Sequence, residues 1–374
     1  MKPKKILYGI CGIGNGYVNR QLPIIEHYAK EAELMIFAYD ESLKVLNSKF
    51  KDFANVKIAE VAVPFYVGNK IGLNFEATLT NSINKNKDFF TINTRALSQA
   101  QKFIGKPDVV ISDYEPVCAQ YAYSYKASLI TIDQQSKYLL GDFSQELGGA
   151  TYADEVARLI MFFPIATRRV ACSFFNVPFK KYPETPVTIV APILKESILS
   201  MKRKPSTRRK SILVYFSSQK EINQPIEEVL AILSEQKDCD FHIFLKERIN
   251  EEINLRLKYK NIKLYKHGAK SFPNILANCN GIISTAGHSL LSEAMYLNIP
   301  VYAMPLDLYE QQMNAYVISK NKFGVQALAV DAGLLNEFIP KLDIFENNIK
   351  HDTNILLRKA SLETFLELIE ETIN

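Results

Sequence analysis

Residues 279–324 read CNGIISTAGHSLLSEAMYLNIPVYAMPLDLYEQQMNAYVISKNKFG, and this stretch decides the fold. An apolar run at 281–284 predicts a buried parallel strand. A small turn at 285–287 then leads into a helix that begins near His288 or Ser289 and carries apolar residues at helical spacing. Because a second short apolar run follows that helix, the stretch predicts a strand–helix–strand unit of an open α/β sheet.

The start of this helix carries two signals for a nucleotide. A glycine-containing turn before a helix leaves backbone N–H groups at the positive end of the helix dipole, which suits a phosphate. Glu293 lies one helical turn beyond Ser289, so both side chains can face one ligand. A carboxylate binds phosphate poorly but accepts hydrogen bonds from a ribose diol. Together the two signals predict a nucleotide and not a bare phosphate.

The segment TAGHSLLSEA and the following P-L-D-x-x-E-Q-x-x-N-A resemble the donor-binding region of GT-B glycosyltransferases that use nucleotide sugars. The resemblance is closest to the branch that includes MurG and the UDP-glycosyltransferases, within a less characterised prokaryotic group. It implies that the glycine turn binds the diphosphate, the helix glutamate binds the ribose, and the acidic–glutamine pair binds the donor sugar. The donor-binding residues that it implies are Gly287, His288, Ser289, Glu293, Glu310, Gln311 and Asn314, with Ser218 from the first turn of the second domain.

Composition excludes several other classes of protein. The chain has 374 residues and a net charge of +5, but six of its 45 Lys and Arg residues lie in 201–210. Because the basic charge is local, we expect a solvated linker there and no nucleic-acid partner. The five cysteines are scattered without metal-ligand spacing, which predicts buried free thiols in a reducing cytosol.

No metal or other cofactor is expected, since the nucleotide sugar is a co-substrate. The sequence shows neither a signal peptide nor a membrane span, so a cytoplasmic protein is expected. The apolar stretch 159–166 is compatible with a wall of the acceptor site or with a peripheral contact at the inner face of the membrane.

The first half of the chain opens on a similar pattern. A strand at 4–10 runs into the glycine-rich turn GICGIGNG, and a helix is predicted to begin near Tyr17. In the GT-B families this turn, here Gly14, Asn15 and Gly16, meets the acceptor. Relatives with the pattern G-x-G-x-G-H-x-x-R have their general base at the position of Tyr17, whereas Arg20 is retained.

The tyrosine at this position is the main departure from the family. A tyrosine has a reference pKa of about 10 and is a poor base at neutral pH. Three alternatives therefore stay open: Tyr17 has a positional role and another residue is the base, the acceptor needs no base, or the protein is not a transferase.

Two acidic residues are expected where ligands of open α/β sheets bind. Asp113 follows a predicted buried strand at 106–112, and Asp133 follows the next one at 128–132. Asp113 is the candidate for the catalytic base or for a partner of that base. The alternative is that Asp113 caps the helix that begins at Pro116.

The openings KKILYGICGIG and RKSILVYFSSQ are built alike, which predicts two Rossmann-like, doubly wound α/β domains that face a cleft. The predicted parts are an N-terminal acceptor-side domain at 1–192, a basic linker at 193–210, a nucleotide-sugar-binding domain at 211–355 and a C-terminal helix at 356–374. We expect the last helix to cross back to the first domain.

The sequence thus predicts an inverting, metal-independent glycosyltransferase of GT-B fold that moves a sugar from a nucleoside-diphosphate sugar, UDP being preferred, to an acceptor hydroxyl. A glycan or lipid-linked acceptor in cell-envelope glycan synthesis is implied by the resemblance only. Two alternatives remain, a nucleotide-sugar hydrolase or 2-epimerase of the same fold, and a catalytically inactive nucleotide-sugar-binding protein.

Overall fold

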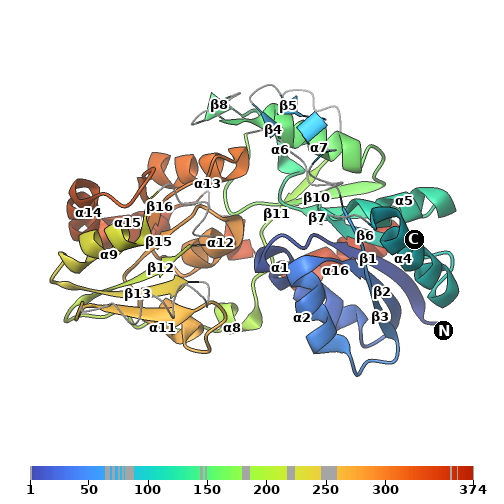
Figure 1. The fold of residues 1–374 in the computed structure, drawn as a ribbon, viewed down its shortest axis with the longest axis horizontal. Helices are drawn as coiled ribbons and strands as arrows, with labels where there is room; N and C mark the ends of the chain where they lie inside the picture. Colours follow the sequence, from blue (N-terminus) through green and yellow to red (C-terminus); the bar gives the residue numbers. More distant parts are fainter. Residues whose placement is uncertain are drawn as a thin grey trace. The chain divides into compact units, whose positions relative to one another are not determined.

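The computed structural model describes residues 2–63, 68–69, 72–74, 76–77, 80, 88–143, 146–147, 150–178, 186–216, 224–245, 259–353, 356–359 and 361–373. Within this part, the chain divides into two compact units (Figure 1). Unit 1 comprises Met1–Ile193 with Lys359–Asn374, and unit 2 comprises Leu194–Arg358. The predicted linker at 193–210 therefore belongs almost wholly to unit 2.

Unit 1 contains a parallel sheet of seven strands in the order β11-β10-β7-β6-β1-β2-β3. Its strands are β1 (Lys4–Ile10), β2 (Ala32–Ala38), β3 (Val56–Glu60), β6 (Val109–Asp113), β7 (Leu129–Asp133), β10 (Arg168–Cys172) and β11 (Thr188–Val190). Two short antiparallel pairs join β4 (Gly68–Asn69) to β5 (Gly72–Leu73) and β8 (Glu146–Leu147) to β9 (Ala150–Thr151). The strand order reverses between β1 and β6, and ligands of such sheets bind beyond the strand ends at this point.

Helices cover both faces of this sheet. The helices of unit 1 are α1 (Asn15–Tyr28), α2 (Asp40–Phe50), α4 (Phe89–Phe103), α5 (Pro116–Tyr125), α6 (Lys137–Leu140), α7 (Tyr152–Phe162) and α16 (Leu362–Ile373). One core cluster packs α1, α2 and α16 on one face, and a second packs α4, α5 and α7 on the other. The sheet is therefore doubly wound.

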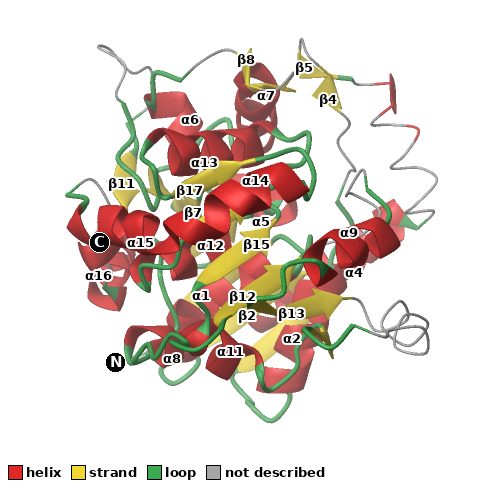
Figure 2. Ribbon diagram, turned by 90° about the vertical axis from the view of Figure 1, so that its left-hand side faces the viewer, coloured by secondary structure: helices red, strands yellow, loops and turns green. Residues whose placement is uncertain are grey.

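Unit 2 contains a parallel sheet of six strands in the order β14-β13-β12-β15-β16-β17. Figure 2 shows β13, β12 and β15 of this sheet side by side. Its strands are β12 (Lys210–Tyr215), β13 (Cys239–Leu245), β14 (Ile262–Lys266), β15 (Gly281–Ser284), β16 (Val301–Ala303) and β17 (Gly324–Gln326). Its helices are α8 (Glu196–Leu199), α9 (Ile226–Ser234), α11 (Phe272–Asn278), α12 (His288–Tyr296), α13 (Tyr309–Lys320), α14 (Ala332–Phe338) and α15 (Leu342–His351), with 3-10 turns η2 (Ile339–Lys341) and η3 (Leu356–Lys359). Counted along the chain, the order is 3-2-1-4-5-6, which is that of a dinucleotide-binding Rossmann sheet. The same six-strand order occurs in unit 1, so two Rossmann-like halves are confirmed.

The C-terminal helix α16 completes the core of unit 1, as predicted for a helix that crosses back. Phe365 and Ile369 of α16 lie in the cluster formed with α1. Glu370 accepts hydrogen bonds from the Nζ atom of Lys4 at 2.5 Å and from the hydroxyl of Tyr28 at 3.0 Å. The last turns of the chain are thus fixed to its first strand and first helix.

Some local predictions need correction. Helix α1 begins at Asn15, so Asn15 and Gly16 form its first turn and are not part of a loop. The linker prediction fails at Arg203, whose side chain is only 12% exposed and pairs with Glu346 at 2.9 Å. Most of the polar section at 68–88 lies outside the described residues.

The expectation for the cysteines is met. All five cysteines are buried free thiols. Among the helices of the described part, none is long and apolar enough to cross a membrane.

Candidate functional site

The turn between β15 and α12 leaves space above a helix start. Gly287 is the N-cap of α12, and no side chain caps the helix. A Cβ atom built on Gly287 would meet no atom within 4 Å, so the backbone is open to a close approach. The first N–H groups of a helix have no partners within the helix. This turn can therefore receive an anionic group on backbone donors.

Asn314 connects α13 to this turn. Its Nδ2 atom donates to the carbonyl of Ala286 at 2.9 Å and to Oε1 of Glu310 at 3.3 Å. The side chain is fully buried, but Oδ1 has no hydrogen-bond partner. Because an unpaired buried acceptor is costly, it indicates a donor that the described residues do not supply. A ligand hydroxyl or an ordered water beside the Ala286 turn would fill that role.

Glu293 lies on α12, one turn from the helix start, and is partly buried. Burial raises the pKa of its carboxyl to about 7, and the charge of Lys195 opposes this shift. Burial also raises the pKa of the Tyr215 phenol, with a smaller contribution from the negative charge of Glu293. A carboxyl pKa raised this far is often found at functional sites.

Tyr215 is a site residue that the sequence analysis missed. It ends β12, and its ring stacks on His267 with the centroids 4.7 Å apart and the planes 8° from parallel. The two side chains come from the ends of β12 and β14, at the edge of the sheet where ligands bind. The sequence signal that could have identified Tyr215 is an aromatic residue at the end of the first strand of a Rossmann-like half.

The other predicted donor residues are distributed unevenly. The ring of His288 is buried against Ser292, whose hydroxyl also donates to the carbonyl of His288 at 2.8 Å. The Oε1 atom of Gln311 accepts from the backbone N–H of Leu306 at 3.0 Å, so this oxygen already holds the loop before α13. Ser289 and Glu310 are partly buried at the turn, and Ser218 lies outside the described residues.

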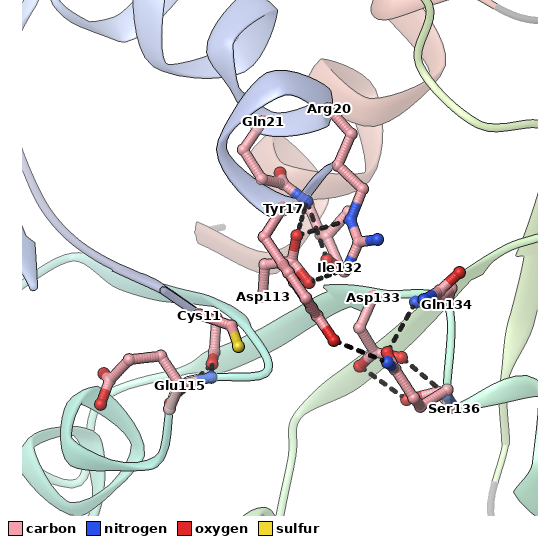
Figure 3. A network of polar contacts seen from close by, with 12 residues as sticks. Cys11, Tyr17, Arg20, Gln21, Asp113, Glu115, Ile132, Asp133, Gln134 and Ser136 are labelled. Atoms are coloured by element: carbon pink, nitrogen blue, oxygen red, sulfur yellow. Dashed lines mark hydrogen bonds and ion pairs between the residues drawn. The ribbon is translucent and has the colours of Figure 1, made fainter. Parts of the chain in front are cut away.

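In unit 1, Asp113 is at the centre of a buried polar network (Figure 3). Arg20 donates from Nε to Oδ2 at 2.7 Å and from Nη2 to Oδ1 at 2.5 Å. The Nε2 atom of Gln21 donates to Oδ2 at 2.7 Å and to the carbonyl of Ile132 at 3.0 Å. The hydroxyl of Tyr8 donates to Oε1 of Gln21 at 2.5 Å.

This pairing bears on the role of Asp113. The side chain is fully buried and both of its oxygens accept hydrogen bonds. Burial raises the pKa of Asp113, whereas the adjacent Arg20 guanidinium opposes that shift. A base must reach the proton that it removes. Of the two predicted roles, the geometry favours that of a partner over that of the base itself.

Tyr17 lies beside this network. The Cζ atom of Arg20 is 4.4 Å from the centroid of the Tyr17 ring, a cation–π contact. The hydroxyl of Tyr17 accepts a hydrogen bond from Nε2 of Gln135 at 3.1 Å (Figure 3). Arg20 therefore contacts both Asp113 and the ring of Tyr17. The two predicted catalytic residues belong to one cluster.

The carboxylates that follow β6 and end β7 have different hydrogen-bond partners. Tyr114 adopts a left-handed backbone with φ of 57°, and the following Glu115 caps α5 by accepting from Val117 and Cys118. The helix cap is thus Glu115, and the alternative that Asp113 caps α5 is wrong. Asp133 accepts from the N–H and the hydroxyl of Ser136 at 2.6 and 2.9 Å.

Two further polar atoms that follow β6 and β7 are buried without a partner among the described residues, namely the hydroxyl of Tyr114 and the Oε1 atom of Gln134. Each can bind a polar group of a ligand or a water. A group of metal-ligating side chains, by contrast, does not occur among the described residues.

Two Rossmann-like halves of this kind occur in solved glycosyltransferases. The chain is similar to UDP-glucose: anthocyanidin 3-O-glucosyltransferase in complex with UDP, with a TM-score of 0.70, 13% identity and coverage of 100% of this chain and 99% of that chain. It is also similar to a glycotransferase of kitacinnamycin, with a TM-score of 0.69, 14% identity and full coverage of both chains.

The fold and the sequence together define the class. The protein is a glycosyltransferase of GT-B fold. It belongs to glycosyl transferase family 1, whose model matches residues 4–343. A curated relative from Rickettsia bellii, UDP-N-acetylglucosamine--N-acetylmuramyl-(pentapeptide) pyrophosphoryl-undecaprenol N-acetylglucosamine transferase, is 23% identical over 84% of this chain and 90% of its own length. The transferase of the same name from Rickettsia canadensis is 23% identical over 72% of this chain and 76% of its length.

Proposed function

We propose that the protein is an inverting, metal-independent glycosyltransferase that moves a sugar from a UDP-sugar to an acceptor hydroxyl. The observation that carries this proposal is the uncapped start of α12, with the unpartnered buried Oδ1 atom of Asn314 beside it. The UDP donor is supported by the names of the two curated relatives, which contain UDP-N-acetylglucosamine.

In the proposed mechanism, the diphosphate binds the backbone at Gly287–Ser289 and the ribose diol donates to Glu293. The acceptor oxygen attacks the anomeric carbon, and negative charge develops on the departing diphosphate. The positive end of α12 stabilises that charge, as preorganised hydrogen-bond donors stabilise charge that develops in a transition state. Metal independence follows from this scheme because the helix supplies the stabilisation that a divalent cation would otherwise give.

The acceptor is proposed to bind unit 1 at the ends of β1, β6 and β7. Gly14 has φ of 69° and open space around its Cβ position, so the loop before α1 can approach a substrate closely. Tyr17 contacts the acceptor in this scheme. Asp113 holds Arg20 and, through it, the Tyr17 ring.

A lipid-linked acceptor for a cell-envelope glycan is the proposed substrate class, with the protein in the cytoplasm and in contact with the inner face of the membrane. The names of the two relatives include a pyrophosphoryl-undecaprenol acceptor. In unit 1, Ile160, Met161 and Ile165 are exposed by 56%, 37% and 74%, which suits a peripheral contact with lipid.

The test is calorimetric titration of the wild type and of Glu293→Ala with UDP, dTDP and GDP. We expect micromolar binding of UDP and a loss of about 1.5–3 kcal/mol in the variant, as for a hydrogen bond to a charged group. Asp331→Ala, which removes a helix cap of unit 2 far from β15 in sequence, is the control. If the folded wild type bound none of the nucleotides, the proposed function would be wrong.

Product analysis separates the transferase from its alternatives. A hydrolase or 2-epimerase of the same fold would consume the UDP-sugar without acceptor and release UDP with a free or rearranged sugar. An inactive binding protein would bind UDP but consume no donor with any acceptor.

A further inference from the structure

Gln135 follows β7 and was not among the predicted site residues. Its side chain is 3% exposed, and both ends of its amide are used. The Nε2 atom donates to the Tyr17 hydroxyl at 3.1 Å, and Oε1 accepts from the backbone N–H of Gln134 at 3.3 Å. Rotating the amide by half a turn would place an NH₂ group against that N–H. The backbone therefore fixes which end of Gln135 faces Tyr17.

Tyr17 is held from a second direction by its ring. The guanidinium of Arg20 lies 4.4 Å from the ring centroid, and Arg20 is itself held by two hydrogen bonds to Asp113. The ring position thus depends on β6 and α1, and the hydroxyl direction depends on the end of β7. Arg20 on α1, Asp113 on β6 and Gln135 after β7 together fix the position of the Tyr17 phenol.

The direction of the hydrogen bond from Gln135 has a chemical consequence. An amide nitrogen can only donate, so the phenolic oxygen is the acceptor in this contact and its own proton points elsewhere. We propose that Gln135 is a positioning residue that directs the hydroxyl proton of Tyr17 to an oxygen of the acceptor substrate, so that Tyr17 acts there as a hydrogen-bond donor. This inference rests on the proposed function, in which the acceptor binds this edge of unit 1.

The kinetic test uses the full chain with UDP-N-acetylglucosamine and the lipid-linked acceptor named for the relatives. Gln135→Leu removes the donor to Tyr17, and Gln135→Glu replaces it by a group that accepts at neutral pH and so reverses the hydrogen bond. One hydrogen bond of about 0.5–1.5 kcal/mol corresponds to a roughly 2- to 13-fold rise in acceptor KM. We expect that rise in Gln135→Leu, a larger one in Gln135→Glu, and a change in kcat of less than about 3-fold in either.

Tyr17→Phe distinguishes a donor from a base. A donor predicts a KM effect like that of Gln135→Glu, an unchanged pH profile of kcat/KM, and no further loss when Gln135→Leu is added. A general base predicts a fall in kcat of about 100-fold or more and loss of one limb of the pH profile. The second result would overturn the proposal. Gln120→Leu, on the exposed surface of α5, is the matched control.

A measurement without substrate keeps the two proposals separable. In protein labelled with 3-fluorotyrosine, Tyr17→Phe identifies the fluorine resonance of Tyr17. We expect Gln135→Leu and Gln135→Glu to shift or broaden this resonance while Gln120→Leu leaves it in place. An unchanged resonance in both Gln135 variants would show that Gln135 does not position Tyr17. A wild type that turns over no acceptor would refute the proposed function, and the resonance would still decide the positioning.

Discussion

The two units share a strand order but use the carboxyl edges of their sheets in opposite ways. In unit 1, neighbouring side chains bind the carboxylates at this edge, Asp113 through Arg20 and Asp133 through Ser136. In unit 2, α12 starts without a side-chain cap, and Asn314 keeps an acceptor that the described residues leave unpartnered. Under the proposed function, the carboxylates of unit 1 are preset before the acceptor binds, whereas the donor turn of unit 2 is completed by its ligand.

The largest effect is expected from breaking the network of unit 1. Asp113→Ala leaves the Arg20 guanidinium buried and unpaired, which should lower the free energy of unfolding by about 3–5 kcal/mol. Urea unfolding, with hydrogen exchange to locate the loss in unit 1, measures it. UDP binding by unit 2 should survive under native conditions.

The matched variants separate the charge from the packing. Combining Asp113→Leu with Arg20→Met should restore much of the stability, because no charge is then left without a partner. The exposed pair of Lys210 and Asp343 is the control, and Asp343→Ala should have little effect. A small loss in Asp113→Ala would mean that water reaches Arg20 and that unit 1 is not preset.

The two helix-start glycines sharpen the comparison. Gly287→Ala should leave the melting temperature unchanged, since φ is −68° and the added methyl group meets no atom within 4 Å. The same methyl group should weaken UDP binding about tenfold or more, because it occupies the space through which the diphosphate approaches the backbone. Gly14→Ala should leave UDP binding unchanged and cost about 1–2 kcal/mol of stability because of its φ of 69°. Calorimetry should detect the loss of UDP binding in Gly287→Ala only, and thermal unfolding should detect the loss of stability in Gly14→Ala only.

The raised pKa of Glu293 predicts that UDP binding by unit 2 depends on pH. The pKa of this carboxyl is raised to about 7, so it becomes ionised, and able to accept from the ribose, as the pH rises through that value. UDP affinity should increase by about threefold to tenfold between pH 6 and pH 8. In Glu293→Gln, any remaining dependence of UDP affinity on pH comes from the phosphate of the ligand. An equal dependence in both proteins would contradict the role of Glu293 as the acceptor for the ribose.

The same raised pKa also affects the stability of the free protein. Because the folded pKa of Glu293 lies above its ordinary value of 4.5, ionisation is unfavourable in the folded state, and stability is lost as the pH rises from about 4.5 to 7. At pH 8 the free energy of unfolding of Glu293→Gln should therefore exceed that of the wild type by about 1–2 kcal/mol, whereas the two proteins should be equally stable at pH 4.5. If Glu293→Gln were less stable than the wild type at pH 8, contacts in the free protein would stabilise the carboxylate.

The sequence predicted the elements around the donor turn closely because local signals determine them. The strand Gly281–Ser284 and the helix from His288 follow from an apolar run, a glycine turn and helical spacing. The boundary of α1 was two residues late, since Asn15 and Gly16 are weak helix formers that a tertiary context places in the first turn.

The contacts of the unit 1 site could not be predicted in the same way. Arg20 and Asp113 are separated by 93 positions, and Tyr17 and Gln135 by 118. Spacing along the chain places each residue at a sheet edge but does not tell which side chains bind each other. The sequence therefore named Tyr17 and Asp113, whereas the link through Arg20 and the contribution of Gln135 required the fold.

The position of α16 constrains the order in which this protein can be made. The second unit is one continuous segment and has all its residues once the ribosome has passed 358, whereas the first still lacks Phe365 and Ile369. N-terminal domains generally fold first during synthesis. Here the N-terminal domain must keep part of the apolar face beneath α1 uncovered until α16 has been made, and a chain truncated after 358 would keep that face exposed.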